Sequence, residues 1–158
     1  MKRILFVCTG NTCRSPMAEA ILKQKLKWVG IRGVAVSSAG IQAEEGEKMS
    51  PNAFLALKQL GIVNYAFRSR RLTEKMMARS DLVIVMTERQ RDLLCDWPNV
   101  RTAAEIAGGG DIPDPFGGTL ENYIDISHAL ERVCNVLLQK MPEELCKLRL
   151  LAITAAIF

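Results

Sequence analysis

A cysteine and an arginine are separated by five residues in the segment Cys8-Thr9-Gly10-Asn11-Thr12-Cys13-Arg14-Ser15. A thiolate is a strong nucleophile, and a guanidinium can bind two oxygens of a phosphoryl group at once. An apolar run precedes the segment and a helical pattern follows it, so backbone N–H groups and a helix N-terminus can converge on one anion. These groups should lower the pKa of the Cys8 thiol. The segment therefore predicts phosphoryl transfer through a phosphocysteine, with Arg14 binding the phosphoryl oxygens.

The polar residues of this segment can support the nucleophile. The Ser15 hydroxyl can donate a hydrogen bond to the Cys8 thiolate and stabilise it as a leaving group, although its alternative role is to cap the helix. Asn11 can hold the loop in shape by bonding to Ser37 or Ser38 at the end of a neighbouring strand. We expect phosphate to be bound by Thr9, Gly10, Asn11, Thr12, Cys13, Arg14 and Ser15, with Ser38 and Asn11 as structural support.

Phosphoryl transfer also needs a proton donor for the leaving group, and a glycine- and proline-rich loop at residues 108–118 carries two carboxylates, Asp111 and Asp114. We expect Asp114 to be the donor. The alternative is that its Asp-Pro pair simply forms a turn. The catalytic interpretation is favoured because open α/β sheets place functional groups at the carboxyl ends of their strands, where the two loops can meet.

The cysteine pattern favours free thiols over a disulfide framework, because five cysteines is an odd number in a chain that can form its own core. Cys13 is either a small buried residue or a redox partner that forms a disulfide with an oxidised Cys8. The only histidine, His128, falls opposite the apolar face of its predicted helix and should be solvated. No CxxC or histidine-rich spacing is present, so neither a metal site nor a cofactor is expected.

Strand and helix patterns alternate along the chain. Strands are predicted at residues 3–8, 34–38 (ending at Gly40), 81–86 and around 100–101. Helices are predicted from 15 to about 29, at 51–61, from 72 through 77, after Thr87, and from about 120 to 141. The alternation implies a single α/β domain with a four-stranded parallel, doubly wound sheet and helices on both faces.

Size and charge limit the function classes. The 158 residues, 49% of them hydrophobic, fit one domain, which we place at residues 1–142. The net charge of +4 is not gathered into a stretch that would bind nucleic acid. The first apolar run is too short for a signal peptide, so we expect a cytoplasmic protein. We further expect a monomer or weak homodimer.

The tail, residues 143–158, ends in an apolar stretch at 148–158 that is too short to cross a membrane. We favour a final helix docked on the domain. A hydrophobic contact with a partner or second copy, and a cloning or truncation artefact, are the alternatives.

Three segments carry a family resemblance: residues 8–19, Ser38-Ala39-Gly40, and Asp114-Pro115-Phe116-Gly117-Gly118. Together they resemble the low-molecular-weight protein tyrosine phosphatase family, over the chain up to about Gln139. The resemblance implies that Cys8 is the nucleophile, Arg14 the phosphate clamp and Asp114 the general acid and then general base. It also implies that Cys13 is the redox partner.

Two features concern the substrate. Tyrosine-directed members usually carry a bulky aliphatic residue where Thr12 stands and an aromatic pair after the Asp-Pro. Thr12 and Phe116-Gly117-Gly118 instead resemble the bacterial protein-arginine phosphatases, with Phe116 among the substrate-binding residues. A threonine hydroxyl can orient water or a phosphoramidate, and Asp114 can pair with a guanidinium leaving group. The resemblance therefore implies phosphorylated proteins as substrates, with phosphoarginine hydrolysed and phosphotyrosine as the alternative.

One departure concerns the support of the loop. Many relatives have a histidine where Phe67 stands, and a phenyl ring cannot make that polar contact. We therefore expect the loop around Asn11 to be held differently, by Ser69 or Arg68.

Two other reactions or roles are weighed against phosphatase activity. Arsenate reduction uses a similar fold, but it needs a relay of later cysteines, and Cys95, Cys134 and Cys146 are not closely paired. A phosphate-binding module without catalysis is the third hypothesis.

Overall fold

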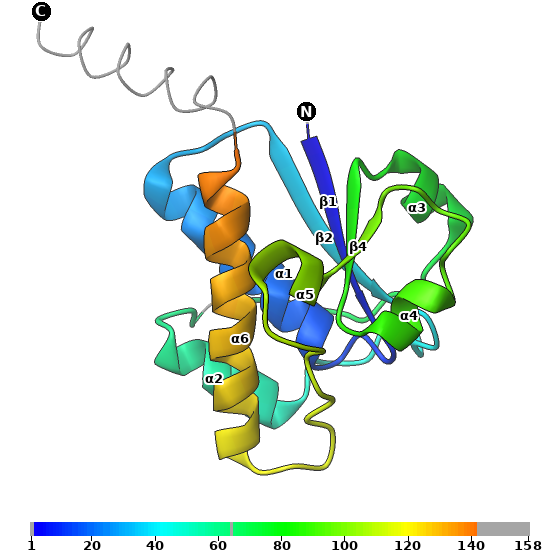
Figure 1. Ribbon diagram of the computed structural model, residues 1–158. Coiled ribbons are helices and arrows are strands. Elements are labelled where there is room, and N and C mark those ends of the chain that lie inside the picture. Colours follow the sequence, from blue (N-terminus) through cyan, green and yellow to red (C-terminus); the bar gives the residue numbers. More distant parts are fainter. Residues whose placement is uncertain (1, 64, 142–158) are drawn as a thin grey trace, which may run out of the picture.

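The computed structural model describes residues 2–63 and 65–141. Its centre is a sheet of four parallel strands in the order β2-β1-β3-β4 (Figure 1). The strands are β1 (Lys2–Cys8), β2 (Val34–Gly40), β3 (Leu82–Val85) and β4 (Val100–Thr102). The predicted fold class is therefore confirmed. The predicted docking of the tail lies outside the described residues.

Strand β1 occupies the middle of the sheet because its side chains are apolar on both faces. Ile4, Phe6 and Cys8 contribute to one hydrophobic cluster, while Leu5 and Val7 contribute to another on the opposite face. All five are at most 2% exposed. The reactive thiol is thus the last member of a buried strand, and its position is fixed by the core.

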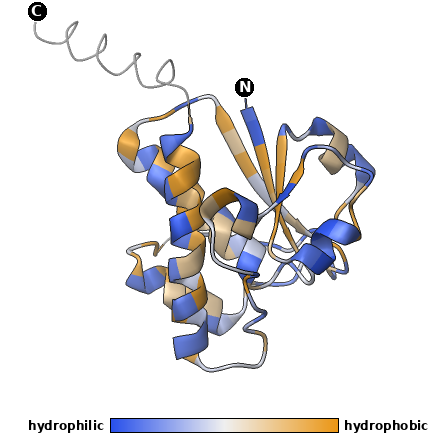
Figure 2. Ribbon diagram, in the orientation of Figure 1, coloured by the Kyte–Doolittle hydropathy of each residue, from blue (hydrophilic) through white to orange (hydrophobic). Residues whose placement is uncertain are grey.

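Helices cover both faces of the sheet (Figure 1). The first cluster packs beneath α1 (Arg14–Val29), α2 (Pro51–Gln59), α5 (Ala103–Ala107) and α6 (Leu120–Gln139). The second lies beneath α3 (Glu74–Arg79) and the region of α4 (Glu88–Asp92). Figure 2 shows mostly hydrophobic residues along the strands and a mixture along α6, whose buried face is apolar. None of the helices within the described ranges is long and apolar enough to cross a membrane.

One helix was not predicted. The five residues of α5 are too few to show a helical period, and the only sequence signal is the spacing of its capping box, in which Thr102 and Glu105 bond each other's backbone N–H groups. The predicted helix at 51–61 ends at Gln59, and Gly61 follows with a left-handed φ of 77°.

The carboxyl ends of the strands converge on one edge of the sheet. At the end of β2, a Cβ on Gly40 would lie 2.7 Å from the carbonyl oxygen of Thr9 and 2.8 Å from the backbone nitrogen of Asn11. Only glycine permits this approach. At the end of β3, the carbonyl of Met86 accepts a hydrogen bond from the N–H of Ile112, which ties the loop at residues 108–118 to the same edge.

Candidate active site

Residues 8–14, which we call the phosphate loop, connect β1 to α1. They line a cavity of about 220 Å³ together with Asp114 and Phe116, and we call this the cradle. Cys8 and Arg14, at its two ends, are 2% and 3% exposed. The structure thus brings the predicted nucleophile, clamp and proton donor together, although Asp114 lies 100 positions from Arg14 in the chain.

Asn11 holds the phosphate loop in shape. It has a left-handed φ of 53°, which asparagine tolerates better than most residues. Its side-chain amide donates to Ser15 Oγ at 2.8 Å and to Ser38 Oγ at 3.0 Å, and its Oδ1 accepts from the backbone N–H of Arg70 at 2.8 Å. Its own backbone N–H points to Cys8 Sγ at 3.3 Å. Of the two serines considered from the sequence, Ser38 is the partner.

Ser15 contacts the nucleophile directly. Its Oγ lies 2.9 Å from Cys8 Sγ and 3.3 Å from the carbonyl oxygen of Ala39. Because Asn11 occupies one acceptor site of this hydroxyl, the single hydroxyl proton can go either to Ala39 or to the sulfur. The first arrangement suits a thiol that donates to Ser15, and the second suits a thiolate. Cys13 is the N-cap of α1 and makes no side-chain cap bond, so Ser15 is not the capping residue.

The pKa of Cys8 differs from the sequence-based prediction. Burial raises the pKa of the Cys8 thiol, while hydrogen bonds from Ser15, the positive charge of Arg14 and the backbone N–H of Asn11 act to lower it. The expected net lowering was wrong, because Cys8 itself is only 2% exposed and its sulfur loses its hydration. The guanidinium of Arg14 also pairs with a carboxylate, which offsets part of its field at the sulfur.

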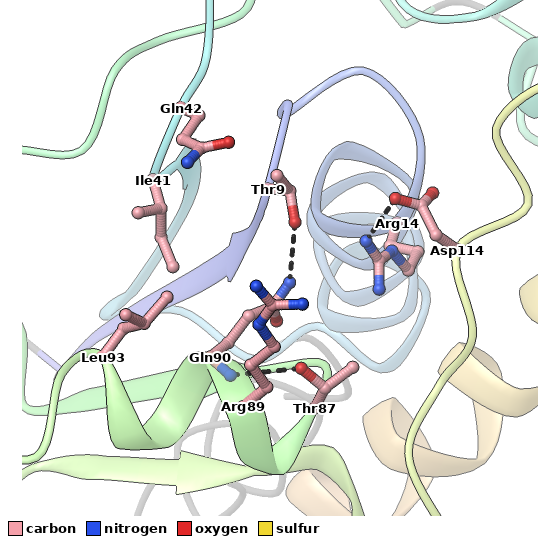
Figure 3. Close-up of a pocket in the computed structure, with 9 residues that line it drawn as sticks. All are labelled: Thr9, Arg14, Ile41, Gln42, Thr87, Arg89, Gln90, Leu93 and Asp114. Carbon is pink, nitrogen blue, oxygen red and sulfur yellow. Dashed lines mark hydrogen bonds and ion pairs between the residues drawn. The ribbon is translucent and has the colours of Figure 1, made fainter.

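Arg14 and Asp114 form an ion pair, with Nη2 2.7 Å from Oδ2 (Figure 3). Arg14 Nη1 donates to the carbonyl of Ile112 at 3.1 Å, so two bonds fix the guanidinium. Its buried Nε has no hydrogen-bond partner among the described residues, which leaves one N–H donor for an oxyanion. Asp111 does not share this position, because its Oδ1 accepts from the backbone N–H of Glu88 at 2.9 Å.

Cys13 is buried next to the cradle and carries a free thiol, as do Cys8 and Cys134. Its sulfur lies 3.4 Å from the hydroxyl of Tyr123, which also accepts from Ser50 Oγ at 3.1 Å. Burial raises the pKa of Tyr123 to about 12, so this hydroxyl stays protonated at neutral pH. As predicted, His128 is exposed; it lies 3.7 Å from Glu131.

Glu19, for which the sequence predicted no role, is only 3% exposed. Its carboxylate accepts from Ser38 Oγ at 2.6 Å and pairs with Lys23 at 2.5 Å and Arg70 at 3.4 Å. Hydrogen bonds therefore run without a break from Glu19 through Ser38, Asn11 and Ser15 to Cys8. The available signal was an acidic residue within the apolar run from Pro16 to Leu22, whose members are buried in α1.

The prediction that Ser69 or Arg68 replaces the missing histidine was wrong. Ser69 Oγ bonds to backbone groups of Glu44 and Glu47, and Arg68 bonds to the carbonyl of Phe67. The backbone N–H of Arg70 holds Asn11 instead, by donating to its Oδ1. The carbonyl of Arg70 accepts from the backbone N–H of Gly40, which places this segment beside the end of β2. Phe67 stacks on Tyr65 with ring centroids 6.1 Å apart.

A second cavity of about 380 Å³, the side cavity, adjoins the cradle (Figure 3). Thr9, Arg14 and Asp114 line both cavities. Its floor includes Gln90, which is 5% exposed and donates through Nε2 to Thr9 Oγ1 at 3.2 Å. No group of three histidine, cysteine or acidic side chains that could hold a metal ion is present in residues 2–63 and 65–141.

Comparison with known proteins agrees with this geometry. Residues 3–147 match the family model described as low molecular weight phosphotyrosine protein phosphatase. The chain belongs to this family. Within this phosphatase family, it is 40% identical to the protein-arginine-phosphatase of Geobacillus stearothermophilus, over 90% of this chain and 97% of the relative.

Solved structures agree as well. The YwlE arginine phosphatase from Geobacillus stearothermophilus superposes with a TM-score of 0.83 at 38% identity, covering 93% of this chain and 97% of that one. A YwlE mutant with serine in place of a cysteine, and with its active site serine phosphorylated, gives a TM-score of 0.80 at 37% identity, covering 90% and 99%.

Proposed function

We propose that this protein hydrolyses phosphoarginine in proteins through a phosphocysteine at Cys8. The observation that carries the proposal is the lining of the cradle, in which Asp114 is held against the guanidinium of Arg14 and the Thr12 side chain joins them. A carboxylate held there can also pair with the guanidinium that leaves from phosphoarginine. The names of the similar arginine phosphatases support the same substrate.

In the first step, Cys8 Sγ attacks phosphorus and the P–N bond breaks. Arg14 and the backbone N–H groups of the phosphate loop bind the phosphoryl oxygens, and a protonated Asp114 donates its proton to the departing nitrogen. The Cys8 thiol must lose its proton before attack. A dianionic phosphoryl group in the cradle can accept that proton, which compensates for the raised pKa of the thiol.

In the second step, water attacks the phosphocysteine and the S–P bond breaks. Asp114, now a carboxylate, accepts a proton from the water, and the Ser15 hydroxyl donates a hydrogen bond that stabilises the departing thiolate. Inorganic phosphate and the Cys8 thiolate are formed, and protonation of this thiolate restores the starting thiol. The phosphorylated active-site serine in the YwlE mutant supports this type of covalent intermediate.

Phosphotyrosine is the second candidate substrate, because the family model is named for it. The arrangement at Cys8, Arg14 and Asp114 serves either leaving group. What favours phosphoarginine is Thr12, whose half-buried side chain lines the cradle and offers a hydroxyl where a bulky aliphatic residue would offer only apolar contact.

Arsenate reduction is disfavoured. Its relay needs later cysteines that exchange electrons with the nucleophile, yet Cys134 is fully buried and contacts the carbonyl of Ala18. Burial also raises the pKa of Cys134, which makes its thiol unreactive. The free thiols of the described residues are compatible with the cytoplasmic location that we propose.

The decisive experiment compares kcat/KM for matched phosphoarginine and phosphotyrosine proteins. We expect a preference for phosphoarginine, and a preference for phosphotyrosine would overturn the assignment. Trapping tests the covalent step separately: acid-quenched enzyme should carry phosphate on the sulfur of Cys8. Cys8→Ala should carry none, and label on another residue would contradict the mechanism.

A further inference from the structure

The side cavity has no role in the two chemical steps described above. It nevertheless adjoins the cradle, because Thr9, Arg14 and Asp114 belong to the walls of both. Its remaining walls come from the segments that follow β2 and β3, namely Ile41, Gln42, Thr87, Arg89, Gln90 and Leu93. A protein substrate bound in the cradle therefore has neighbouring residues within reach of the side cavity.

The charge of the side cavity is unbalanced. Arg14 and Asp114 neutralise one another at 2.7 Å. Arg89 is exposed and has no salt bridge or hydrogen-bond partner for its guanidinium among the described residues. Its neighbour Glu88 is engaged elsewhere, since its carboxylate lies 3.1 Å from Arg91. One positive charge is therefore left to face a ligand.

The side chain of Arg89 extends into the cavity toward Thr9 (Figure 3). The backbone that carries it is held in place by its neighbours. Thr87 Oγ1 accepts from the backbone N–H of Gln90 at 3.2 Å, and Gln90 in turn bonds to Met86 through Oε1 and to Thr9 through Nε2. The distance between the Arg89 backbone and the phosphate loop is therefore fixed, which a selective contact requires.

We propose that the side cavity binds an acidic side chain adjacent to the phosphorylated residue of the protein substrate, with Arg89 recognising its carboxylate. Consecutive Cα atoms are about 3.8 Å apart, so a residue one or two positions from the phosphorylated one can reach the adjoining cavity. A guanidinium can bind a carboxylate through two parallel hydrogen bonds. The inference rests on the proposed function only in taking a phosphoprotein as the substrate.

The test uses phosphopeptides that are identical except for Glu, Gln or Lys at one position within two residues of the phosphorylated residue. At low ionic strength, we expect kcat/KM of the unmodified enzyme to be about threefold to tenfold higher for the best-placed Glu than for Gln, and lower still for Lys. Arg89→Gln should reduce the Glu-to-Gln ratio to about one, and Arg89→Glu should favour Lys. Added salt should weaken the preference, because the contact is partly exposed.

Arg32→Gln is the matched control. Arg32 is exposed and precedes β2, at the end of the sheet opposite the cradle, so this variant removes one positive charge without touching the cavity. It should keep the Glu-to-Gln ratio of the unmodified enzyme. Thermal unfolding of each variant checks that the fold is retained. A ratio that is near one in the unmodified enzyme, or that persists in Arg89→Gln, overturns the proposal.

The same peptide series is made with phosphoarginine and with phosphotyrosine. Failure of the phosphoarginine assignment can then be distinguished from failure of the proposal for the side cavity. Hydrolysis of phosphotyrosine peptides alone, with a ratio that depends on Arg89, would support the side cavity and overturn the phosphoarginine assignment. Hydrolysis of phosphoarginine peptides with a Glu-to-Gln ratio that does not depend on Arg89 would support the phosphoarginine assignment and overturn the proposal for the side cavity.

Discussion

Asp114 lies 2.7 Å from Arg14, so the proposed proton donor and the proposed phosphate clamp are already in contact. The contact fixes the carboxylate at the mouth of the cradle, where the leaving group must depart. Asp114 also competes with the phosphoryl group for Arg14, because the guanidinium must turn away from the carboxylate to bind two phosphoryl oxygens. Each group therefore orients the other before the substrate enters.

Asp114→Asn should lower kcat for phosphoarginine by a factor of about 10² to 10⁴, because the amide cannot supply a proton to the leaving nitrogen. A substrate with a good leaving group, such as p-nitrophenyl phosphate, should lose less. Steady-state kinetics on both substrates measures the difference. Asp111→Asn is the matched control and should keep normal rates, since Asp111 bonds to the backbone of Glu88. Equal losses in the two variants would contradict the role of Asp114.

Ser15→Ala should raise the pKa of Cys8 further. Burial already raises this pKa, and the Ser15 hydroxyl is one of the groups that lower it. The thiolate is the alkylated form, and its fraction falls about tenfold for each pH unit below the pKa. The pH profile of Cys8 alkylation by iodoacetamide, followed by mass spectrometry, should therefore move to higher pH. Ser80→Ala removes a hydroxyl that donates to the carbonyl of Met76, and it should leave the profile unchanged. A shift to lower pH in Ser15→Ala would refute the assignment.

Glu19→Gln should reduce kcat by about tenfold to a hundredfold, because small displacements of a nucleophile are costly and Glu19 orients Cys8 through Ser38 and Asn11. The free energy of unfolding should fall by about 1–3 kcal/mol, because the buried Glu19 carboxylate loses its pairs with the half-exposed Lys23 and Arg70 and a charge-assisted bond to Ser38. Denaturant unfolding and kinetics measure the two effects.

Glu131→Gln is the control for Glu19, since it removes a carboxylate that pairs with Lys25 between α1 and α6. It should leave kcat unchanged. If Glu19→Gln lost stability but kept both its kcat and the alkylation profile of Cys8, Glu19 would be structural only.

Thr12→Ile should shift the substrate preference toward phosphotyrosine. The substitution removes a hydroxyl from the cradle wall and adds apolar surface that suits an aromatic ring. The ratio of kcat/KM for phosphoarginine over phosphotyrosine should fall by about tenfold or more. Thr12→Ser, which keeps the hydroxyl, should retain most of the ratio. An unchanged ratio in Thr12→Ile would show that selectivity resides elsewhere.

Cys13→Ser should make peroxide inactivation harder to reverse. In the unmodified enzyme, oxidation of Cys8 to a sulfenic acid is expected to be followed by attack of the Cys13 thiol, which forms a disulfide and releases water. Dithiothreitol would then restore activity. Cys95→Ser, which removes an exposed thiol, should recover like the unmodified enzyme. Equal recovery of Cys13→Ser would exclude a protective disulfide.

The phosphate loop could be predicted from the sequence because its chemistry is local. Cys8 and Ser15 are seven positions apart, and the strand before them and the helix after them are each specified by their own apolar pattern. The alternation of strands and helices likewise determined a parallel sheet. The short α5 was missed, because five residues are too few to show a period.

Only the tertiary structure decided the contacts between distant segments. Asn11 bonds to Arg70 across 59 positions and Thr9 to Gln90 across 81, and neither pairing follows a local pattern. The raised pKa of Cys8 has the same origin, because burial depends on what packs over the sulfur. The sequence determined which groups could act on a phosphoryl group. Packing decided which of them meet, since the carboxyl ends of parallel strands gather at one edge regardless of their separation along the chain.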